Sequence, residues 1–282
     1  MKISDKLKEI MQDINSECNT VSPRALKIYE LINYKQTFKN AQNLIASFNK
    51  RKYSFKYMAA ELLWYLSWSL DTDKIWKYAK LWLDIANEDW TVNSNYWYIV
   101  LYRFIADYYN QYNYIIEKLK EDKDSRQALI RYNAHEHVYK GNKDFTCTIS
   151  NQFFIRDNKL DMIVNMRSND LFFGFQYDIV WFWLVLQSIR LDLLDTYPNL
   201  ELWNIYYSAG SMHIYESMMM IAREILTEDD WIDYNIILNK SLLKLKKDIQ
   251  QNWTKYWYDL EKTKDYKQFI KDKFYIDINL NE

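Results

Sequence analysis

Glycine and proline are scarce in this chain of 282 residues, which has three glycines (Gly141, Gly174 and Gly210) and two prolines (Pro23 and Pro198). Its turns must therefore rest mainly on Asn, Asp, Lys and Ser. Because so few glycines remain, each one marks a candidate position where the backbone tolerates no Cβ.

Cysteine and net charge are also in short supply. Cys18 and Cys147 lie far apart without metal-ligand spacing, so we expect no disulfide framework, no metal site and a reducing, cytoplasmic setting. The net charge of −1 gives no electrostatic basis for binding duplex nucleic acid or an anionic membrane, but it permits a pocket for one phosphate. No apolar run reaches the roughly 18 residues of a membrane span. The segment 1–15 predicts an amphipathic helix rather than a signal peptide.

Apolar residues make up 49% of the chain and aromatic residues 18%, which is enough for a sizeable core. Periodicity predicts helices over 1–15, 25–48, 54–69, 74–85, 98–120, 177–194 and from 213 to near 271. Strands are predicted over 126–133, 144–155, 159–166 and 201–208, with a hairpin turn at Arg156-Asp157-Asn158. Strands flanked by helical blocks, without a linker or repeat, indicate one α+β domain over residues 1–282.

Cys147 lies inside the predicted strand 144–155. On its own it fits a small buried core residue better than a nucleophile. A nucleophilic thiolate requires a lowered pKa, and therefore positive charge nearby.

Two carboxylates stand in apolar surroundings. Glu61 interrupts the run 58–66, so it either reaches water at an edge or is buried for acid–base work. Asp178 precedes eight apolar residues. It either favours the first turn of a helix through the helix dipole or points into a pocket.

The densest polar cluster covers residues 165–174 and includes Arg167 and Ser168. It fits a phosphate site and a polar turn equally well. Further along, His213 and Tyr215 follow Gly210 at a predicted strand-to-helix junction, where they would cap, pack or bind.

In order, these segments resemble the thymidylate synthase superfamily, most closely its deoxycytidylate hydroxymethylase branch. The matching segments are Glu61-Leu62-Leu63-Trp64, Lys74-Ile75-Trp76, Asn93-Ser94-Asn95-Tyr96, Asp124-Ser125-Arg126, Cys147, Ile155-Arg156-Asp157-Asn158-Lys159, Asn165-Met166-Arg167-Ser168-Asn169-Asp170, Phe173-Gly174-Phe175, Asp178, and Gly210-Ser211-Met212-His213-Ile214-Tyr215. Each is weak alone, whereas the ordered set is specific.

The resemblance implies that Cys147 adds to ring carbon 6 of a pyrimidine nucleotide, so that ring carbon 5 takes a one-carbon unit from methylenetetrahydrofolate. Tyr96 would sit beside the cysteine, and Glu61 would organise water and proton transfers. The implied nucleotide-binding residues are Arg24, Arg126, Arg167, Ser168, Asn169, Asp178, His213 and Tyr215. The implied folate-side residues are Trp76, Asp170, Gly174 and Tyr177. The resemblance also implies a homodimer formed through the sheet, in which Arg126 reaches the phosphate bound by the other subunit. The arginines would supply the positive charge that a thiolate requires.

Position 178 separates the branches of the family. Thymidylate synthases resemble Phe-Asn here, whereas this chain has Tyr177-Asp178. An amide matches the ring NH and carbonyl of uracil, while a carboxyl group can accept from the amine of cytosine and share a proton with its ring nitrogen. The sequence therefore favours dCMP. The polar segment 144–148 replaces the Ala-Pro-Cys-His of synthases and fits water access, hence a hydroxymethyl product.

Three departures from the family pattern keep alternatives open. Gln127 stands where a second arginine is usual, Trp97 replaces a glycine, and the segment 275–282 does not match the synthase tail. The alternatives are a divergent thymidylate synthase or dUMP hydroxymethylase, and a catalytically weak nucleotide-binding or regulatory homologue. A nucleotide hydroxymethylase would fit a virus that modifies its own DNA bases.

Overall fold

The computed structural model describes residues 2–39 and 43–281. Its longer helices are α1 (Ile3–Glu17), α2 (Phe55–Leu66), α3 (Leu81–Ile85), α4 (Tyr96–Leu101), α5 (Gln111–Glu121), α6 (Gln176–Leu193), α7 (Glu216–Leu226), α8 (Leu242–Lys262) and α9 (Tyr266–Phe274). Short helical turns are η1 (Pro23–Ala25), η2 (Ile75–Lys77), η3 (His135–His137) and η4 (Leu171–Phe175). Within these residues, no helix has the length and apolar character needed to cross a membrane.

A large mixed sheet carries most of the strands, in the order β1-β2-β8-β6-β5-β4, and β7 pairs with β8 beside this path. A smaller antiparallel sheet has the order β10-β9-β3. The strands are β1 (Asn19–Val21), β2 (Ile28–Phe38), β3 (Asn43–Phe48), β4 (Leu129–Arg131), β5 (Thr148–Arg156), β6 (Lys159–Met166), β7 (Asn169–Asp170), β8 (Glu201–Tyr215), β9 (Trp231–Leu238) and β10 (Ile276–Leu280).

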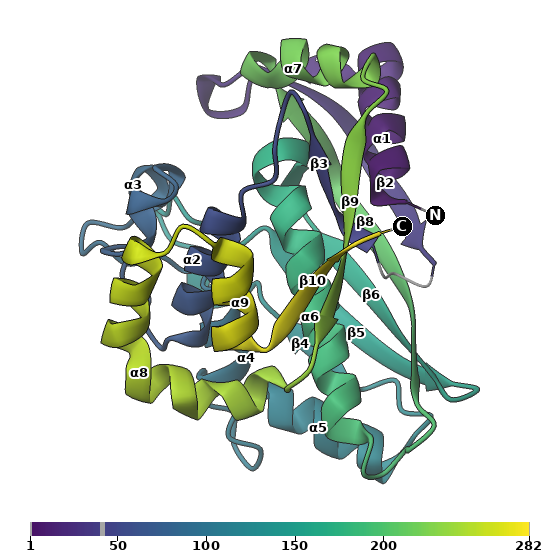
Figure 1. Ribbon diagram of the computed structural model, residues 1–282, viewed down its shortest axis with the longest axis vertical. Coiled ribbons are helices and arrows are strands. Elements are labelled where there is room, and N and C mark those ends of the chain that lie inside the picture. Colours follow the sequence, from purple (N-terminus) through teal and green to yellow (C-terminus); the bar gives the residue numbers. More distant parts are fainter. Residues whose placement is uncertain (1, 40–42, 282) are drawn as a thin grey trace.

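Helix α6 crosses the middle of the molecule (Figure 1) and contacts β6 and β8 of the large sheet and β3 and β9 of the small one. A helix enclosed in this way can be apolar on every face. This enclosure explains why residues 179–186 are all buried. Since η4 joins β7 directly to α6, the first turn of α6 places Asp178 beside the polar cluster of residues 165–174.

Several predicted elements are confirmed. Helix α1 buries the expected apolar stripe, and α6 matches the predicted 177–194. Ser54 caps α2 by accepting a hydrogen bond from the Tyr57 backbone NH at 3.1 Å. The hairpin between β5 and β6 turns on Asp157 and Asn158, both at positive φ (48° and 57°), as a two-residue turn of the primed type requires.

The helix predicted over residues 25–48 is wrong, because β2 and β3 form there; residues 40–42 lie outside the described residues. Ile28, Leu31 and Ile32 are spaced as on a helix. However, β2 pairs with β8 from Ile28 to Phe38, and this long-range pairing outweighs the local pattern.

Other predicted boundaries also change. The predicted helix 74–85 divides into η2 and α3, and 98–120 divides into α4 and α5. Between α4 and α5, Asp107 and Tyr109 have φ values of 68° and 65°, which are incompatible with a right-handed helix. The strand predicted over 126–133 shortens to β4.

The helix predicted from residue 213 to 271 is wrong in two places. Strand β8 continues to Tyr215 because it pairs with β2 and β7, and β9 separates α7 from α8. His213 and Tyr215 are therefore strand residues. Cys147, predicted within a strand, lies immediately before β5.

Candidate active site

Cys147 is held between two segments of the large sheet. Its carbonyl accepts from the Arg167 backbone NH at 2.9 Å. The Arg167 side chain donates to the carbonyls of Thr146 (Nε, 3.2 Å) and Phe145 (Nη2), and its guanidinium lies 5.3 Å from the centroid of the Phe145 ring. The arginine is thus fixed beside the cysteine by the same loop that carries the cysteine.

Burial raises the pKa of the Cys147 thiol above its ordinary value. Arg167 and Arg24 act in the opposite direction, whereas the carboxyl groups of Asp178 and Asp144 raise this pKa further. Positive charge is therefore present near Cys147, but desolvation outweighs it, and the thiol pKa of the free protein stays above its ordinary value.

Apart from Arg126, the predicted nucleotide-binding residues lie in the part of the fold around Arg167. Gly210 makes this approach possible, because a Cβ there would lie 2.7 Å from the Arg167 carbonyl oxygen. The rings of His213 and Tyr215 pack edge-to-face at 5.4 Å on the same stretch of β8. Arg24 lies in η1 at a φ of 52°. Burial raises the pKa values of Tyr215 and Cys147, and the charge of Arg24 acts against both increases. Ser168 is half-buried beside Arg167.

Burial raises the pKa of Asp178 to about 7, and the Asn169 side chain acts in the opposite direction. Asn169 itself donates to the Tyr207 hydroxyl at 3.0 Å. Gly174 leaves the space that both side chains use, since a Cβ there would lie 2.2 Å from Asn169 Oδ1 and 3.4 Å from Asp178 Oδ2. Asp178 is therefore an acid that can carry a proton near neutral pH.

Glu61 is a second acid with a high pKa, raised to about 8 by burial and by the charge of Asp178. The Tyr57 hydroxyl donates to Glu61 Oε1 at 2.6 Å and accepts from Trp82 Nε1 at 3.2 Å. Because these two bonds orient the carboxyl group, Glu61 is both positioned and able to hold a proton.

Tyr96 begins α4 and is buried. Burial and the charges of Asp178 and Cys147 raise its pKa, and the Thr148 hydroxyl acts in the opposite direction. The loop before it is anchored by Asp144, whose carboxylate accepts from the backbone NH groups of Asn93 and Ser94 at 2.7 Å each. This anchoring explains why the segment 93–96 keeps a fixed position beside the cysteine.

On the side expected for folate, Asp170 Oδ1 accepts from the backbone NH groups of Phe172 (2.8 Å) and Phe173. Its Oδ2 is buried and has no hydrogen-bond partner within residues 2–39 and 43–281. Burial raises the Asp170 pKa to about 6. The Tyr177 hydroxyl accepts from the Ser54 NH at 3.3 Å. Trp76 is 37% exposed on η2, and among the described residues no hydrogen bond or ring contact joins its side chain to Asp170 or Tyr177.

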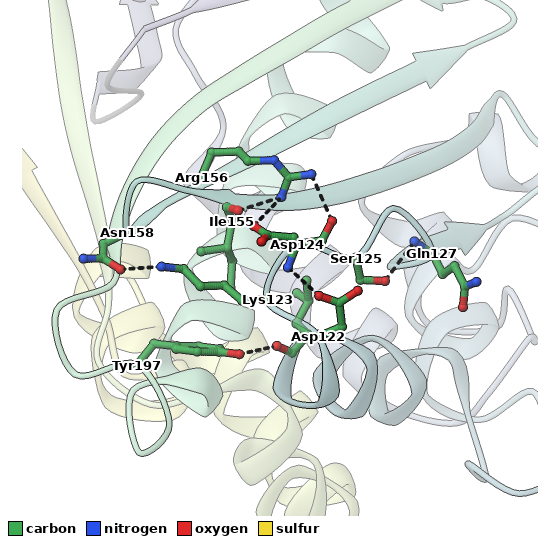
Figure 2. Close-up of polar contacts among 10 residues, drawn as sticks. Asp122, Lys123, Asp124, Ser125, Gln127, Ile155, Arg156, Asn158 and Tyr197 are labelled. Atoms are coloured by element: carbon green, nitrogen blue, oxygen red, sulfur yellow. Dashed lines mark hydrogen bonds and ion pairs between the residues drawn. The ribbon is translucent and has the colours of Figure 1, made fainter.

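Arg126 is the predicted site residue that the fold keeps apart from Cys147. Figure 2 shows the loop around it, on which Gln127 is labelled, beside the turn that carries Arg156. Arg126 is exposed and lines a cavity of about 600 Å³ with Gln127 and Ser125. Its carbonyl accepts a hydrogen bond from Gln152 Nε2 at 2.8 Å, and Gln152 follows Cys147 by five residues, or roughly 17 Å at the rise of a strand.

Sequence reasoning missed two residues of the site. Arg51 donates to the Phe172 carbonyl at 3.1 Å and lies 4.9 Å from the centroid of the Phe173 ring. Tyr207 binds Asn169 next to Asp178. Arg51 stands in a polar loop and Tyr207 in an ordinary strand pattern, so only the fold brings them to the site.

The fold and site define a class of protein. The family model described as thymidylate synthase matches residues 5–272, and the chain belongs to this family. Its fold is similar to that of the thermostable thymidylate synthase A from Bacillus subtilis, with a TM-score of 0.66 and 18% identity over 99% of this chain and 95% of that chain. The predicted α+β, thymidylate synthase-like fold is therefore confirmed.

The more similar relatives come from phages. The deoxycytidylate 5-hydroxymethyltransferase of Enterobacteria phage T4 is 35% identical over 167 residues, which is 57% of this chain and 67% of that protein. The deoxyuridylate hydroxymethyltransferase of Bacillus phage SP01 is 27% identical over 217 residues, 73% of this chain and 55% of that protein. Together with the family, they confirm a one-carbon transferase with methylenetetrahydrofolate as co-substrate.

Proposed function

We propose that this chain converts dCMP, methylenetetrahydrofolate and water into 5-hydroxymethyl-dCMP and tetrahydrofolate. The observation that carries the proposal is Asp178, whose pKa of about 7 leaves its acid form available near neutral pH. In that form one oxygen can share a proton with the ring nitrogen of cytosine while the other accepts from the amine. The amide that synthases resemble at this position would match uracil instead.

Arg167 and Arg24, with Ser168, are the proposed ligands of the 5′-phosphate. Both arginines act to lower the pKa of Cys147, so both guanidinium groups lie within electrostatic reach of the thiol. A phosphate suits paired guanidinium groups because each offers several donors in a planar fork. His213 and Tyr215, adjacent on β8, would then contact the sugar.

Cys147 is the proposed nucleophile, with a bond forming between Sγ and ring carbon 6. Because burial keeps the thiol neutral in the free protein, this bond must form together with loss of the thiol proton, which the two arginines favour. Glu61 has a pKa of about 8 and lies within electrostatic reach of Asp178, so it is suited to hold and return protons during the reaction.

The residues present fit the co-substrate. Among the described residues, Asp170 Oδ2 is buried without a hydrogen-bond partner, and Gly174 adds no side chain beside Asn169 and Asp178. Tyr177 and Trp76 would add aromatic surface, and Asn169 would hold the base from the other side through its contact with Asp178. When bound, methylenetetrahydrofolate supplies the one-carbon unit.

Water is the proposed final reactant at the exocyclic carbon. The hydroxyl groups of Tyr96 and Thr148 lie next to Cys147 and Asp178 and form a polar wall on which a water molecule can be held. In a synthase, hydride from folate would quench the same carbon and give a methyl group. A hydroxymethylated nucleotide would serve DNA modification in a virus.

We also propose a homodimer formed through the outer face of the large sheet. Ile32, Ile149 and Tyr206 are large apolar residues that are 61%, 43% and 40% exposed on three strands of that sheet, and a second copy of the chain would cover them. The backbone of Arg126 is bound to Gln152, which lies roughly 17 Å along the strand from Cys147 of the same chain, farther than an arginine side chain extends. Arg126 would therefore act on the nucleotide of the partner subunit.

The test is a product assay. Purified protein is incubated with methylenetetrahydrofolate and either dCMP or dUMP, and the product is identified by mass spectrometry. Hydroxymethyl-dCMP is the expected product. Hydroxymethyl-dUMP would support the uracil branch of the relative from phage SP01, a methylated dUMP product would indicate a synthase, and no turnover would indicate a binding homologue.

A further inference from the structure

The segment that carries Arg126 is held against β5 at every second carbonyl. The carbonyl of Asp124 accepts from Arg156 Nη2 at 3.1 Å, that of Arg126 from Gln152 Nε2 at 2.8 Å, and that of Ala128 from the Phe153 backbone NH at 2.9 Å. Only the last is an ordinary ladder bond. Two side chains thus extend the pairing of β4 with β5 beyond the residues where the backbone ladder ends.

The same segment is also braced internally (Figure 2). Asp122 Oδ1 accepts from the Asp124 NH at 2.9 Å, and Ser125 Oγ accepts from the Gln127 NH at 3.1 Å. The Ser125 NH in turn donates to the Asp122 carbonyl at 3.1 Å. These bonds fold the segment into a tight bend that presents residue 126 outward.

The turn between β5 and β6 also contacts the segment that carries Arg126 (Figure 2). Lys123 Nζ donates to Asn158 Oδ1 at 2.8 Å, and Arg156 lies 3.7 Å from Asp124 Oδ1. The latter ion pair is exposed and contributes little by itself. The backbone contact matters more, because Arg156 Nη1 also donates to the Ile155 carbonyl at 2.7 Å, so the guanidinium bridges two backbone segments.

In contrast, the guanidinium of Arg126 is free: among the described residues it makes no hydrogen bond or ion pair, although its own carbonyl is held. Gln152 and Arg156 lie on the outer face of the large sheet, since the alternate residues Asn151, Phe153 and Ile155 are buried. That face is the one proposed to meet a second copy of the chain.

We propose that Gln152 and Arg156 are positioning residues that preset the backbone of Arg126 for the phosphate of the partner subunit's nucleotide. This inference rests on the proposed function. A preset backbone reduces the ordering that binding would otherwise require, so the effect should appear mainly in nucleotide affinity.

The test compares wild-type protein with Gln152→Met/Arg156→Met, which removes both donors at similar side-chain length. KM for dCMP should rise about tenfold, with the smaller effect on kcat. Arg156→Lys keeps the charge and should restore part of the loss. Lys159→Gln is the matched control: it removes a cation at the same turn, where Lys159 lies over the Trp203 ring at 3.7 Å, and should leave KM unchanged.

Two further arms show whether the effect passes through Arg126 and acts across the interface. In an Arg126→Ala background, the double substitution should raise KM no further. Mixed dimers of the double variant with Cys147→Ala protein contain one site with an intact cysteine and an intact partner arginine segment. That site should show the wild-type KM.

Distinct results overturn the inference and the function. Equal KM increases with and without Arg126, a raised KM in the mixed dimers, or an unchanged KM in the double variant would refute the positioning role while the function stands. A wild-type chain that turns over no pyrimidine nucleotide would refute the function and this inference together.

Discussion

Replacing Asp178 by asparagine exchanges one carboxyl oxygen for an amide nitrogen in the side chain that is proposed to select the base. The carboxyl group has a pKa of about 7 because it is desolvated, so its acid form can share a proton with cytosine. The amide presents a fixed donor and acceptor that match uracil. Two mismatched hydrogen bonds at about 1.5 kcal/mol each amount to about 3 kcal/mol. The ratio of kcat/KM for dCMP to that for dUMP should therefore fall about 100-fold.

The assay measures both substrates in one mixture and quantifies the two products by mass spectrometry. Asp178→Asn should also lose the pH dependence that the acid introduces: in wild-type protein kcat/KM for dCMP should decline above a pH of about 7, as Asp178 loses its proton. Asp178→Glu, which keeps the carboxyl group, is the control for side-chain chemistry. An unchanged substrate ratio in Asp178→Asn would refute the reading of this residue.

Three further predictions test the site and its scaffold. Cys147→Ala should abolish release of tritium from ring carbon 5 of labelled dCMP; exchange that persists would exclude Cys147 as the nucleophile. Gly174→Ala should destabilise the fold by about 1 to 3 kcal/mol, because its Cβ would lie 2.2 Å from Asn169 Oδ1, and an unchanged urea midpoint would contradict this. Glu61 binds its proton more tightly in the folded state (pKa about 8) than its ordinary value of 4.5, so wild-type stability should fall as pH rises from about 4.5 to 8. Glu61→Gln should flatten that fall, which thermal melts of both proteins at each end of the pH range would measure. Stability that depends equally on pH in the wild-type and Glu61→Gln proteins would show that the carboxyl group is solvated.

Local sequence patterns predicted the elements whose residues decide their own structure. The Asp157-Asn158 turn and the amphipathic α1 fall in this group. Strands β2 and β8 could not be predicted in this way, because their length depends on pairing between residues about 180 positions apart, such as Tyr29 with Ile214. For that reason a helix was wrongly predicted over 25–48, and the strand that carries His213 was cut short.

The site followed the same division. The residue types of Cys147, Arg167 and Asp178 could be read from the ordered motifs, and the structure places them together. The pKa of the Cys147 thiol could not be predicted from the sequence, because it depends on desolvation by the fold as well as on neighbouring charge. Arg51 could not be found either, since its contact with Phe172 joins segments 121 positions apart.

The desolvated acids described above have an electrostatic consequence for the candidate site. At a pH below about 6, the side chains of Cys147, Glu61, Asp178 and Asp170 are mainly neutral, whereas arginine side chains in proteins stay charged. The region around Arg24 and Arg167 is therefore locally cationic within a chain whose net charge is −1. Such a local field attracts a phosphate anion selectively over neutral nucleosides, and it speeds encounter most at low ionic strength.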